Sequence, residues 1–449
     1  MPYEGEYAHY GPLRRITEAE NVKQLLSRCK ICDSSNSSIV SITPSPVEEY
    51  NGELPRLIVA IDGSNTEVPV INGYPGAMLG YCTVASVLID LAQIEELDKT
   101  RPVDPMKLRE TEKAATIDAA LPGSNIVTRR QNSARISFRE ELFDLFQNTI
   151  LDEEDHIPLI NTYEILLSKK PHDLQTCPYS LDDGCNGSFN IPLGTSYCPT
   201  CKKVIFSTDS LRIHERFNDL GSNGEVFGYV RQVWERILLI DLLRCFERRS
   251  LLRHLEHIAF FIDGPLAVFG PPAWLSRSIS IELKRLNTLF KQEVDKDLII
   301  VGIEKSGQFV THFEEIDITE TPGDLLFSPR SYMLLTDEYI KNRIQHSIAT
   351  KRYGQDTYFG RKFYYKTLNG AKIVANIPFL SDEQDTIETT DISLYPQFKT
   401  VCALLDKLVS SRYPNAVEPI ISAHSEAAIP LNLGAKVLQQ LSQALMGVK

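Results

Sequence analysis

Two aspartates in this sequence each follow a run of apolar residues and precede a glycine. Asp62 closes the apolar part of RLIVAIDGSN (56–65), and Asp263 does the same in IAFFIDGPL (258–266). An aspartate at the carboxyl end of a buried strand lies where a sheet opens to a crevice, and the glycine allows a tight turn and close approach of a ligand. Because Asp-Gly after a strand is also ordinary turn chemistry, the interpretation depends on whether the two aspartates lie together.

Two neighbouring strands of this kind would form a carboxylate pair, which repels unless a cation lies between its members. Hard oxygen ligands select Mg²⁺ or Mn²⁺. Such ions, about 4 Å apart when paired, catalyse phosphodiester cleavage by activating water and stabilising the leaving oxygen. The helix-forming segment before the second strand offers Glu235, Asp241 or Glu247 as a third acid, and spacing alone does not choose among them. Since Arg231 precedes Glu235 by four residues, a helix-surface ion pair is the alternative for that acid.

Four cysteines form a second candidate site, with the spacing C-x7-C-x12-C-x2-C. They are Cys177, Cys185, Cys198 and Cys201. The second half, YCPTCKK, has the tight spacing that lets two thiolates reach one tetrahedral ion, so structural zinc is favoured over a loop with free thiols. His214 is expected to be a solvated surface residue. Cys29 and Cys32 form a lone C-x2-C, for which a pair of ordinary cysteines is an equal alternative.

The pattern of apolar residues predicts strands and helices in alternation. We expect strands at 56–62, in the first half of 77–97, before Asp263 and at 297–309. Helices are expected in the second half of 77–97, at 107–120, at 133–150 and over the long stretch that precedes Asp263. Asn369-Gly370 is a strong turn signal, so residues 360–380 are predicted to be a β-hairpin. The segment from Leu408 onward is predicted to be a loop with a helical end.

The composition is that of an ordinary globular protein, with 449 residues, 43% hydrophobic and 24% charged. The formal net charge of −12 argues against a surface coated in basic charge for non-specific nucleic-acid binding, but allows a local basic channel. The first residues lack the charged-then-apolar build of a signal peptide, and no apolar run approaches the roughly 20 residues of a membrane span. With nine cysteines and no export signal, we expect a cytoplasmic protein with reduced thiols.

Five segments in their order and spacing resemble the NurA nuclease family, across roughly residues 55–430. They are LIVAIDGS, VRQVWERILLIDLLR, FFIDGPLAVFGPPAWL, IIVGIEKSG and YPNAVEPIISAHSEAAI. The resemblance is strongest to bacterial members with a cysteine-rich insert. It implies an α/β, ribonuclease H-like fold related to the Argonaute PIWI domain, with a mixed sheet flanked by helices and a zinc-ribbon insertion. It also implies an Mn²⁺-dependent (or Mg²⁺-dependent) DNA nuclease that is a homodimer and works with HerA, a hexameric DNA-translocating ATPase.

The resemblance also implies roles for particular residues. The positions that match the catalytic and metal-binding residues of the family are Asp62, Asp263, Glu235 (with Glu247 as the fallback), Tyr413 and His424. As a metal ligand or proton-transfer group, His424 would lie beside the carboxylates; without the resemblance, a structural histidine is the better interpretation. Tyr413 would position a phosphate or a water, or simply pack against Pro414.

Basic residues mixed with aromatic ones suit single-stranded DNA, because bases stack on the rings and phosphates pair with the cations. The segment RYGQDTYFGRKFYYK (352–366) has this character and contributes Arg352, Arg361 and Lys362 as DNA-binding candidates. Packing of an ordinary hairpin is the competing interpretation. Lys305, in GIEKSG, follows a predicted strand and could contact a phosphate or be a solvated loop lysine.

These observations predict a metal-dependent DNA nuclease with exonuclease and single-strand endonuclease activity, acting in DNA end processing and repair or in antiviral (phage) defence. The predicted organisation is an N-terminal extension (1–50), a nuclease domain (51–435) and a zinc-ribbon-like insertion within it (172–207). The alternative is a catalytically silent nucleic-acid-binding scaffold of the same fold. A second alternative is a guide-directed nuclease of the Argonaute kind. It is not favoured, because the chain is too short for the guide-anchoring domains of such proteins.

Overall fold

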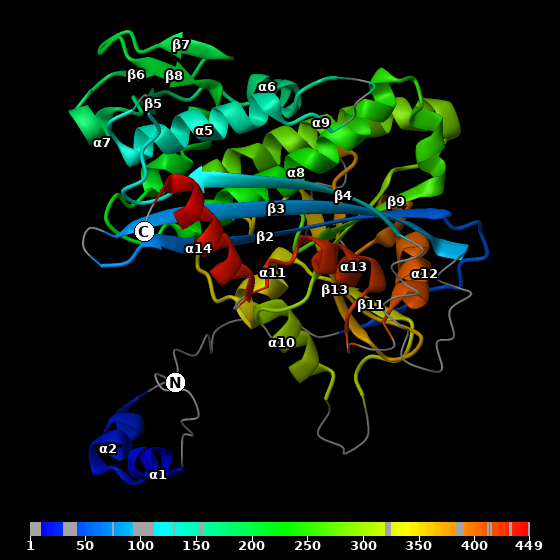
Figure 1. Ribbon diagram of the computed structural model, residues 1–449. Coiled ribbons are helices and arrows are strands. Elements are labelled where there is room, and N and C mark those ends of the chain that lie inside the picture. Colours follow the sequence, from blue (N-terminus) through cyan, green and yellow to red (C-terminus); the bar gives the residue numbers. More distant parts are fainter. Residues whose placement is uncertain are drawn as a thin grey trace.

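A computed structural model of the chain has a large mixed β-sheet at its centre (Figure 1). It describes residues 10–29, 43–73, 76–92, 112–129, 131–151, 154, 156–318, 325–382, 390–410, 413, 415–430 and 433–447. Within these residues the sheet has nine strands in the order β1-β11-β12-β13-β10-β9-β2-β3-β4. Along the chain they are β1 (Ser45–Pro46), β2 (Leu57–Ile71), β3 (Ala77–Asp90), β4 (Glu112–Pro122), β9 (Ile258–Asp263), β10 (Ile299–Glu304), β11 (Ser331–Leu334), β12 (Gly360–Lys366) and β13 (Lys372–Pro378).

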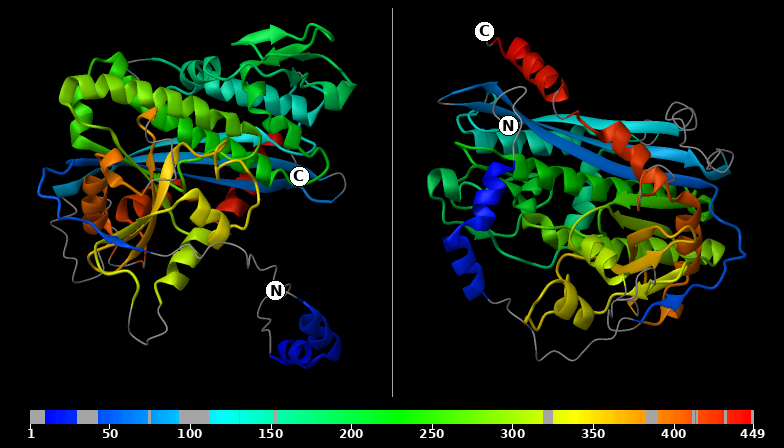
Figure 2. Two further views of the ribbon diagram at one scale, coloured as in Figure 1. Left: turned by 180° about the vertical axis from the view of Figure 1, so that it is seen from behind. Right: turned by 90° about the horizontal axis from the view of Figure 1, so that it is seen from below.

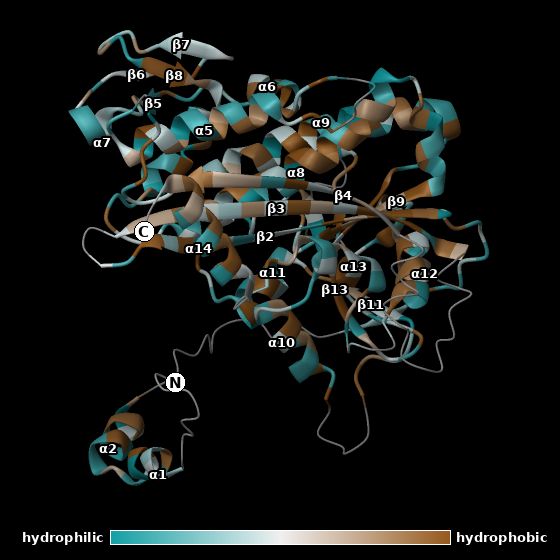
Figure 3. Cartoon of the chain, viewed as in Figure 1, coloured by the Kyte–Doolittle hydropathy of each residue, from teal (hydrophilic) through white to brown (hydrophobic). Residues whose placement is uncertain are grey.

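The centre of the sheet is parallel and its two sides are antiparallel. β9 pairs in parallel with both β2 and β10, and the remaining neighbours pair antiparallel. Parallel strands need covering on both faces, and β9 accordingly reads as a continuous apolar run, which is drawn in brown in Figure 3. The predicted α/β class with a mixed, helix-flanked sheet is confirmed.

Helices cover both faces of the sheet (Figures 1 and 2). One face carries α5 (Ala134–Asn148), α6 (Leu159–Ser168), α8 (Gly224–Arg248) and α9 (Leu275–Val294), and the other carries α12 (Phe398–Leu408) and α13 (Glu418–Ala427). The remaining helices are α1 (Gly11–Glu18), α2 (Glu20–Arg28), α7 (Ser180–Asp183), α10 (Gln308–Ile316), α11 (Asp337–Tyr339) and α14 (Leu433–Met446). None of the described helices is both long and apolar enough to cross a bilayer.

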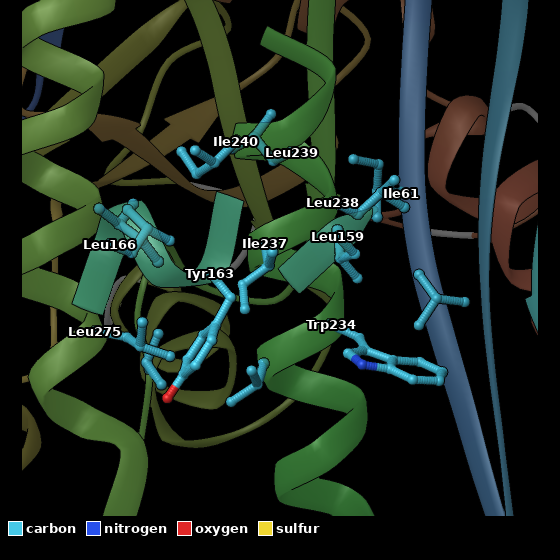
Figure 4. Packing of buried hydrophobic residues seen from close by; sticks show 14 of the residues in the cluster. Ile61, Leu159, Tyr163, Leu166, Trp234, Ile237, Leu238, Leu239, Ile240 and Leu275 are labelled. Atoms are coloured by element: carbon cyan, nitrogen blue, oxygen red, sulfur yellow. The ribbon is translucent and has the colours of Figure 1, made fainter. Parts of the chain in front are cut away.

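The alternation of β2 fixes its position between the two helical layers. Successive side chains of a strand point to opposite faces, so Ile58 and Ala60 pack in the core beneath α12 and α13, whereas Ile61 packs beneath α8. Figure 4 shows Ile61 beside Leu238 of α8. Burial of each large apolar side chain stabilises the fold by about 1.5–3 kcal/mol. This packing holds the backbone of β2 on both sides, directly before Asp62.

Most of the predicted elements are present. The predicted helix at 133–150 is α5, with Ser133 as its side-chain N-cap. The long helix is α8, a short 3₁₀ helix (Leu252–His257) leads into β9, and 360–380 is a hairpin. In the segment 77–97, β3 continues to Asp90, beyond the predicted first half. Of the predicted helix in the second half, residues 93–97 lie outside the described part.

Two predictions of secondary structure were wrong. The described part of 107–120, predicted to be helical, belongs to strand β4. Its residues are good helix formers, but Ala119 and Leu121 are buried while Asp118 and Ala120 are exposed, and pairing with β3 overrides helix propensity. The loop predicted after Leu408 contains α13, which begins with Pro419 in its first turn.

Candidate active site

The candidate active site lies where β2 and β9 separate. The two strands pair as far as Ile61 and Ile262. β9 then ends at Asp263, and Gly264 turns the chain away with φ of 77°. The 15-residue β2 instead continues through Asp62 to Ile71, paired there with β3. The predicted strand end at Asp263 is thus confirmed, whereas Asp62 lies inside its strand; the sheet opens there because β9 ends.

Asp62 and Asp263 converge on a single nitrogen. Lys305 Nζ, just beyond the end of β10, lies 3.2 Å from Asp62 Oδ2 and 2.9 Å from Asp263 Oδ1. Asp62 is only 1% exposed, and its Oδ1 accepts a hydrogen bond from the Gly63 backbone at 2.7 Å. The two acids, 201 positions apart along the printed sequence, therefore share one cation position.

Glu235 of α8 is the third carboxylate at this place. A Cβ atom built on Gly63 would lie 2.7 Å from Glu235 Oε1, so the glycine is what lets the carboxylate approach β2. The other helix acids lie elsewhere: Asp241 accepts a hydrogen bond from Thr162 at 2.5 Å, and Glu247 is paired with Arg285 at 2.6 Å. Of the three acids that spacing left open, the structure brings Glu235 to the two aspartates.

Two arginines of α8 hold Glu235 in place. Arg231 Nη1 lies 2.7 Å from Glu235 Oε1, which is the i,i+4 pair that the sequence offered as an alternative, and Arg236 Nη1 lies 3.2 Å from Oε2. Arg236 also donates to the backbone carbonyls of Asp263, Pro265 and Ala267 at 3.1, 3.0 and 3.3 Å. It thus ties α8 to the turn that follows β9. Nothing in the local sequence distinguishes Arg236 from its neighbours, because its carbonyl partners are 27 or more residues away.

The electrostatics of the site are those of crowded, buried acids. Burial raises the pKa of Asp62 and the charge of Asp263 raises it further, while Lys305 and His424 oppose the rise. Burial also raises the pKa of Glu235, against the effect of Arg231 and Arg236. Both raised pKa values mean that the ionised carboxylates are destabilised here, and an added cation would relieve this.

His424 lies beside Asp62. It is carried by α13 on the opposite helical layer from Glu235, and its Nδ1 is 2.9 Å from Asp62 Oδ2. The imidazole is 58% exposed, so its second ring nitrogen can be reached from solvent. Tyr413 lies in the loop between α12 and α13, is partly exposed, and its backbone N–H donates to Ser410 Oγ at 3.1 Å.

This set of side chains fits a hard divalent cation. Two carboxylate oxygens flank one position that already holds a positive charge, with an imidazole nitrogen alongside, and such donors suit Mn²⁺ or Mg²⁺. The ligand atoms of the acidic site are less tightly grouped than those of the cysteines. Among the described residues, the one group of three or more His, Cys, Asp or Glu whose ligand atoms all lie within 4.8 Å of one another is the four cysteines.

The cysteine group has the dimensions of a tetrahedral metal site. Its Sγ atoms are 3.9 Å apart for Cys177 and Cys201 and 3.8 Å apart for Cys185 and Cys198. Four sulfurs at the Zn–S distance of about 2.3 Å would be about 3.8 Å apart. Burial raises the pKa of the Cys198 thiol. This is outweighed by the backbone N–H groups of Cys201 and Thr200 and by the neighbouring thiols, so that the net pKa is about 6.

The segment predicted to be an insertion (172–207) contains two small hairpins and the short helix α7. The hairpins are β5 (Gln175–Thr176) with β6 (Ser188–Phe189) and β7 (Thr195–Tyr197) with β8 (Val204–Phe206). The segment is attached to α5 through Arg139, which donates to the backbone carbonyl of Val204 in β8 at 3.3 Å. The same guanidinium is buried against Asp209, just after this segment, at 2.6 Å. The prediction that His214 is a solvated surface residue was wrong: it is 5% exposed in a 3₁₀ helix packed against this pair, and burial lowers its pKa to about 4. Cys29 is exposed, and Cys32 lies outside the described residues.

The basic candidates separate into two groups. Lys305 lies in the site and Arg352 is half-buried in the turn before β12. Arg361 and Lys362 are buried in β12, and Lys362 Nζ lies 2.7 Å from Glu304 Oε1 and 3.3 Å from the centroid of the Phe309 ring. The competing interpretation, ordinary hairpin packing, accounts for these two side chains, whose burial does not favour contact with a phosphate.

The mixed sheet, the two aspartates that share one cation position and Glu235 near them define an α/β protein with an acidic candidate metal site. A cysteine cluster lies apart from this site. A sequence profile described as the NurA domain matches residues 56–429. The chain belongs to the NurA family. Among solved structures it is similar to the NurA nuclease from Sulfolobus solfataricus, with 14% identity and a TM-score of 0.31 over 98% of this chain and 97% of that one. A comparison with curated proteins gave no match.

Proposed function

We propose that this protein is a metal-dependent DNA nuclease in which Asp62, Asp263 and Glu235 hold Mn²⁺ or Mg²⁺. The observation that carries the proposal is the convergence of Asp62 and Asp263 on one cation position, each within 3.2 Å of Lys305 Nζ. Membership of the NurA family supports phosphodiester hydrolysis as the reaction. A divalent cation bound there would lower the pKa of water and stabilise negative charge on the phosphate.

The residues of the site would have separate roles in binding and catalysis. Asp62 and Asp263 bind the cation, and Arg231 and Arg236 orient Glu235 toward the same place. His424 Nδ1 faces Asp62, so the imidazole would exchange a proton with the substrate or solvent through Nε2. Tyr413 would position a phosphate or a water, and Lys305 and Arg352 would contact the DNA backbone.

The finer proposals follow from the resemblance to the family. They are a ribonuclease H-like fold, exonuclease and single-strand endonuclease activities, a homodimer, and a HerA-type hexameric ATPase that feeds DNA to the site in end processing or phage defence. The net charge of −12 is compatible with DNA binding if a basic channel lies within an acidic exterior. At the four cysteines we propose structural Zn²⁺, supported by sulfur separations of 3.8 and 3.9 Å.

One observation favours a second candidate function, a catalytically silent nucleic-acid-binding scaffold. The three acids are already matched by three cations, Lys305, Arg231 and Arg236. Because the charges of the carboxylates are balanced in this way, the site needs no metal ion to fold. The presence of the carboxylates alone therefore does not establish that the protein cleaves DNA. The two functions differ in whether DNA is cleaved when Mn²⁺ is added.

The test is digestion of end-labelled single- and double-stranded DNA with Mn²⁺, Mg²⁺ or a chelator. Asp62→Asn and Glu235→Gln should each lower the cleavage rate by about 10² or more, because they remove carboxylates that would hold the divalent cation. Glu247→Gln is the matched control on the same helix, since its carboxylate is paired with Arg285, and it should cut like the wild type. Wild-type cleavage by folded Asp62→Asn would refute the nuclease site, and no cleavage by the wild type under any condition would favour the scaffold.

A further inference from the structure

Lys305 lies where a cation would lie between Asp62 and Asp263. Its ammonium is 3.2 Å from the first carboxylate and 2.9 Å from the second. Asp62 is buried, and a buried charge without a partner is strongly destabilising. An ammonium between two carboxylates also removes their mutual repulsion. The lysine thus does, with one positive charge, what a divalent cation would do there.

The other two cations of the site, Arg231 and Arg236, are bonded to backbone carbonyls as well as to Glu235. Arg236 is 4% exposed and donates to three backbone carbonyls as well as facing Glu235. Arg231 contacts both Glu235 and the carbonyl of Gly63. Arg236 cannot leave without breaking four hydrogen bonds, two of them buried, and Arg231 cannot leave without breaking two part-buried ones. Each bond costs about 1–3 kcal/mol when a buried partner is left unsatisfied.

Lys305 differs from these arginines because its side chain can move while its backbone stays. The side chain is 34% exposed. The preceding residue, Glu304, is anchored by Lys362 at 2.7 Å and by Asn376 at 2.8 Å. Beyond it the chain turns at Gly307, with φ of 103°, where an added Cβ would meet nothing within 4 Å. Rotation of one flexible stem therefore suffices to remove the ammonium from between the carboxylates.

We propose that Lys305 is a built-in competitor of the divalent cation. It holds Asp62 and Asp263 together when no cation is bound, and cation binding displaces its ammonium from between them. The displaced lysine is then released to pair with a phosphate of the substrate, a role for which a mobile ammonium is suited. This inference rests on the proposed nuclease site.

The test is Mn²⁺ binding to the full-length protein without DNA, measured by the loss of the electron paramagnetic resonance signal of free Mn²⁺. Lys305→Met keeps the length of the side chain and removes the charge. It should bind Mn²⁺ about tenfold more tightly than the wild type or better, because no charge-assisted contact has to be broken first. Lys305→Arg keeps the charge and should bind no more tightly than the wild type. Lys291→Met, which breaks a remote contact with Asp297 at 3.4 Å, should leave the affinity unchanged.

A second measurement covers the possibility that Lys305→Met folds poorly. Its melting temperature should be lower than that of the wild type in chelator, and Mn²⁺ should restore it, whereas a purely structural lysine would give no such recovery. The inference is overturned if Lys305→Met binds Mn²⁺ no more tightly than the wild type. It is also overturned if Lys305→Met tightens Mn²⁺ binding by the same factor in a protein that already carries Asp62→Asn. If Asp62→Asn alone leaves wild-type Mn²⁺ binding unchanged, the proposed metal site itself fails.

Discussion

Gly63→Ala should impair the site through a single added methyl group. Gly63 lies in β2 without a positive φ, so alanine is not strained there by its backbone conformation. Its Cβ would, however, lie 2.7 Å from Glu235 Oε1, 2.9 Å from Arg231 Cγ and 3.1 Å from the carbonyl oxygen of Thr83. Since contacts become comfortable at about 3.5 Å, the carboxylate must retreat by about 0.8 Å.

The expected effects follow from that displacement. Overpacking of this kind costs about 1–3 kcal/mol of the free energy of unfolding, and misplacement of a catalytic group by about 1 Å costs up to about 10²-fold in rate. We expect Gly63→Ala to cut DNA with Mn²⁺ about ten to a hundred times more slowly than the wild type while remaining folded, as measured by initial rates and by thermal melting.

Gly228→Ala is the matched control for this prediction. Gly228 lies inside α8, the helix that carries Glu235, and a Cβ there would meet nothing within 4 Å. Alanine should therefore raise the free energy of unfolding by about 0.5–1 kcal/mol and leave the rate unchanged. Wild-type activity and stability in Gly63→Ala would refute the assigned contact between β2 and Glu235.

Three further predictions concern other parts of the molecule. The pKa of His214 is about 4 in the folded protein and about 6.5 in the unfolded chain, so the unfolded state binds more protons between these values. The free energy of unfolding should therefore fall by about 2 kcal/mol from pH 7 to pH 5. Thermal melting should show a smaller fall in His214→Gln, and an equal fall would contradict the burial of His214. Cys198→Ser should lose the bound Zn²⁺, measured by elemental analysis against Cys245→Ser as control, and equal zinc in both would exclude the four-sulfur site. Arg236→Met should lower cleavage by more than tenfold by releasing the turn after Asp263, whereas cleavage at the wild-type rate would show that this turn needs no such support.

The parts of the fold with strong local patterns could be predicted from the sequence. The apolar face and serine cap of α5, the length of α8 and the Asn369-Gly370 turn are local signals, and these elements are present. β4 could not be predicted in this way, because its residues favour a helix and it becomes a strand through pairing with β3.

For the site, the sequence indicated which acids could act but not how they are arranged. Asp62 and Asp263 stood out by their glycine neighbours, yet the position of Asp62 inside β2 depends on where β9 stops. Glu235 could not be chosen over Glu247 because what singles it out is space at Gly63, which is far away in sequence. The burial of His214 and the carbonyl contacts of Arg236 are likewise consequences of tertiary packing.

The central claim is that Asp62 and Asp263 share one divalent cation with Glu235 beside them. The most direct test is a crystal of the protein soaked in Mn²⁺, with an anomalous difference map recorded at the manganese edge. We predict a peak between the carboxylates of Asp62 and Asp263, with the ammonium of Lys305 moved away from both. A map with no manganese between these carboxylates in a fully soaked crystal would contradict it.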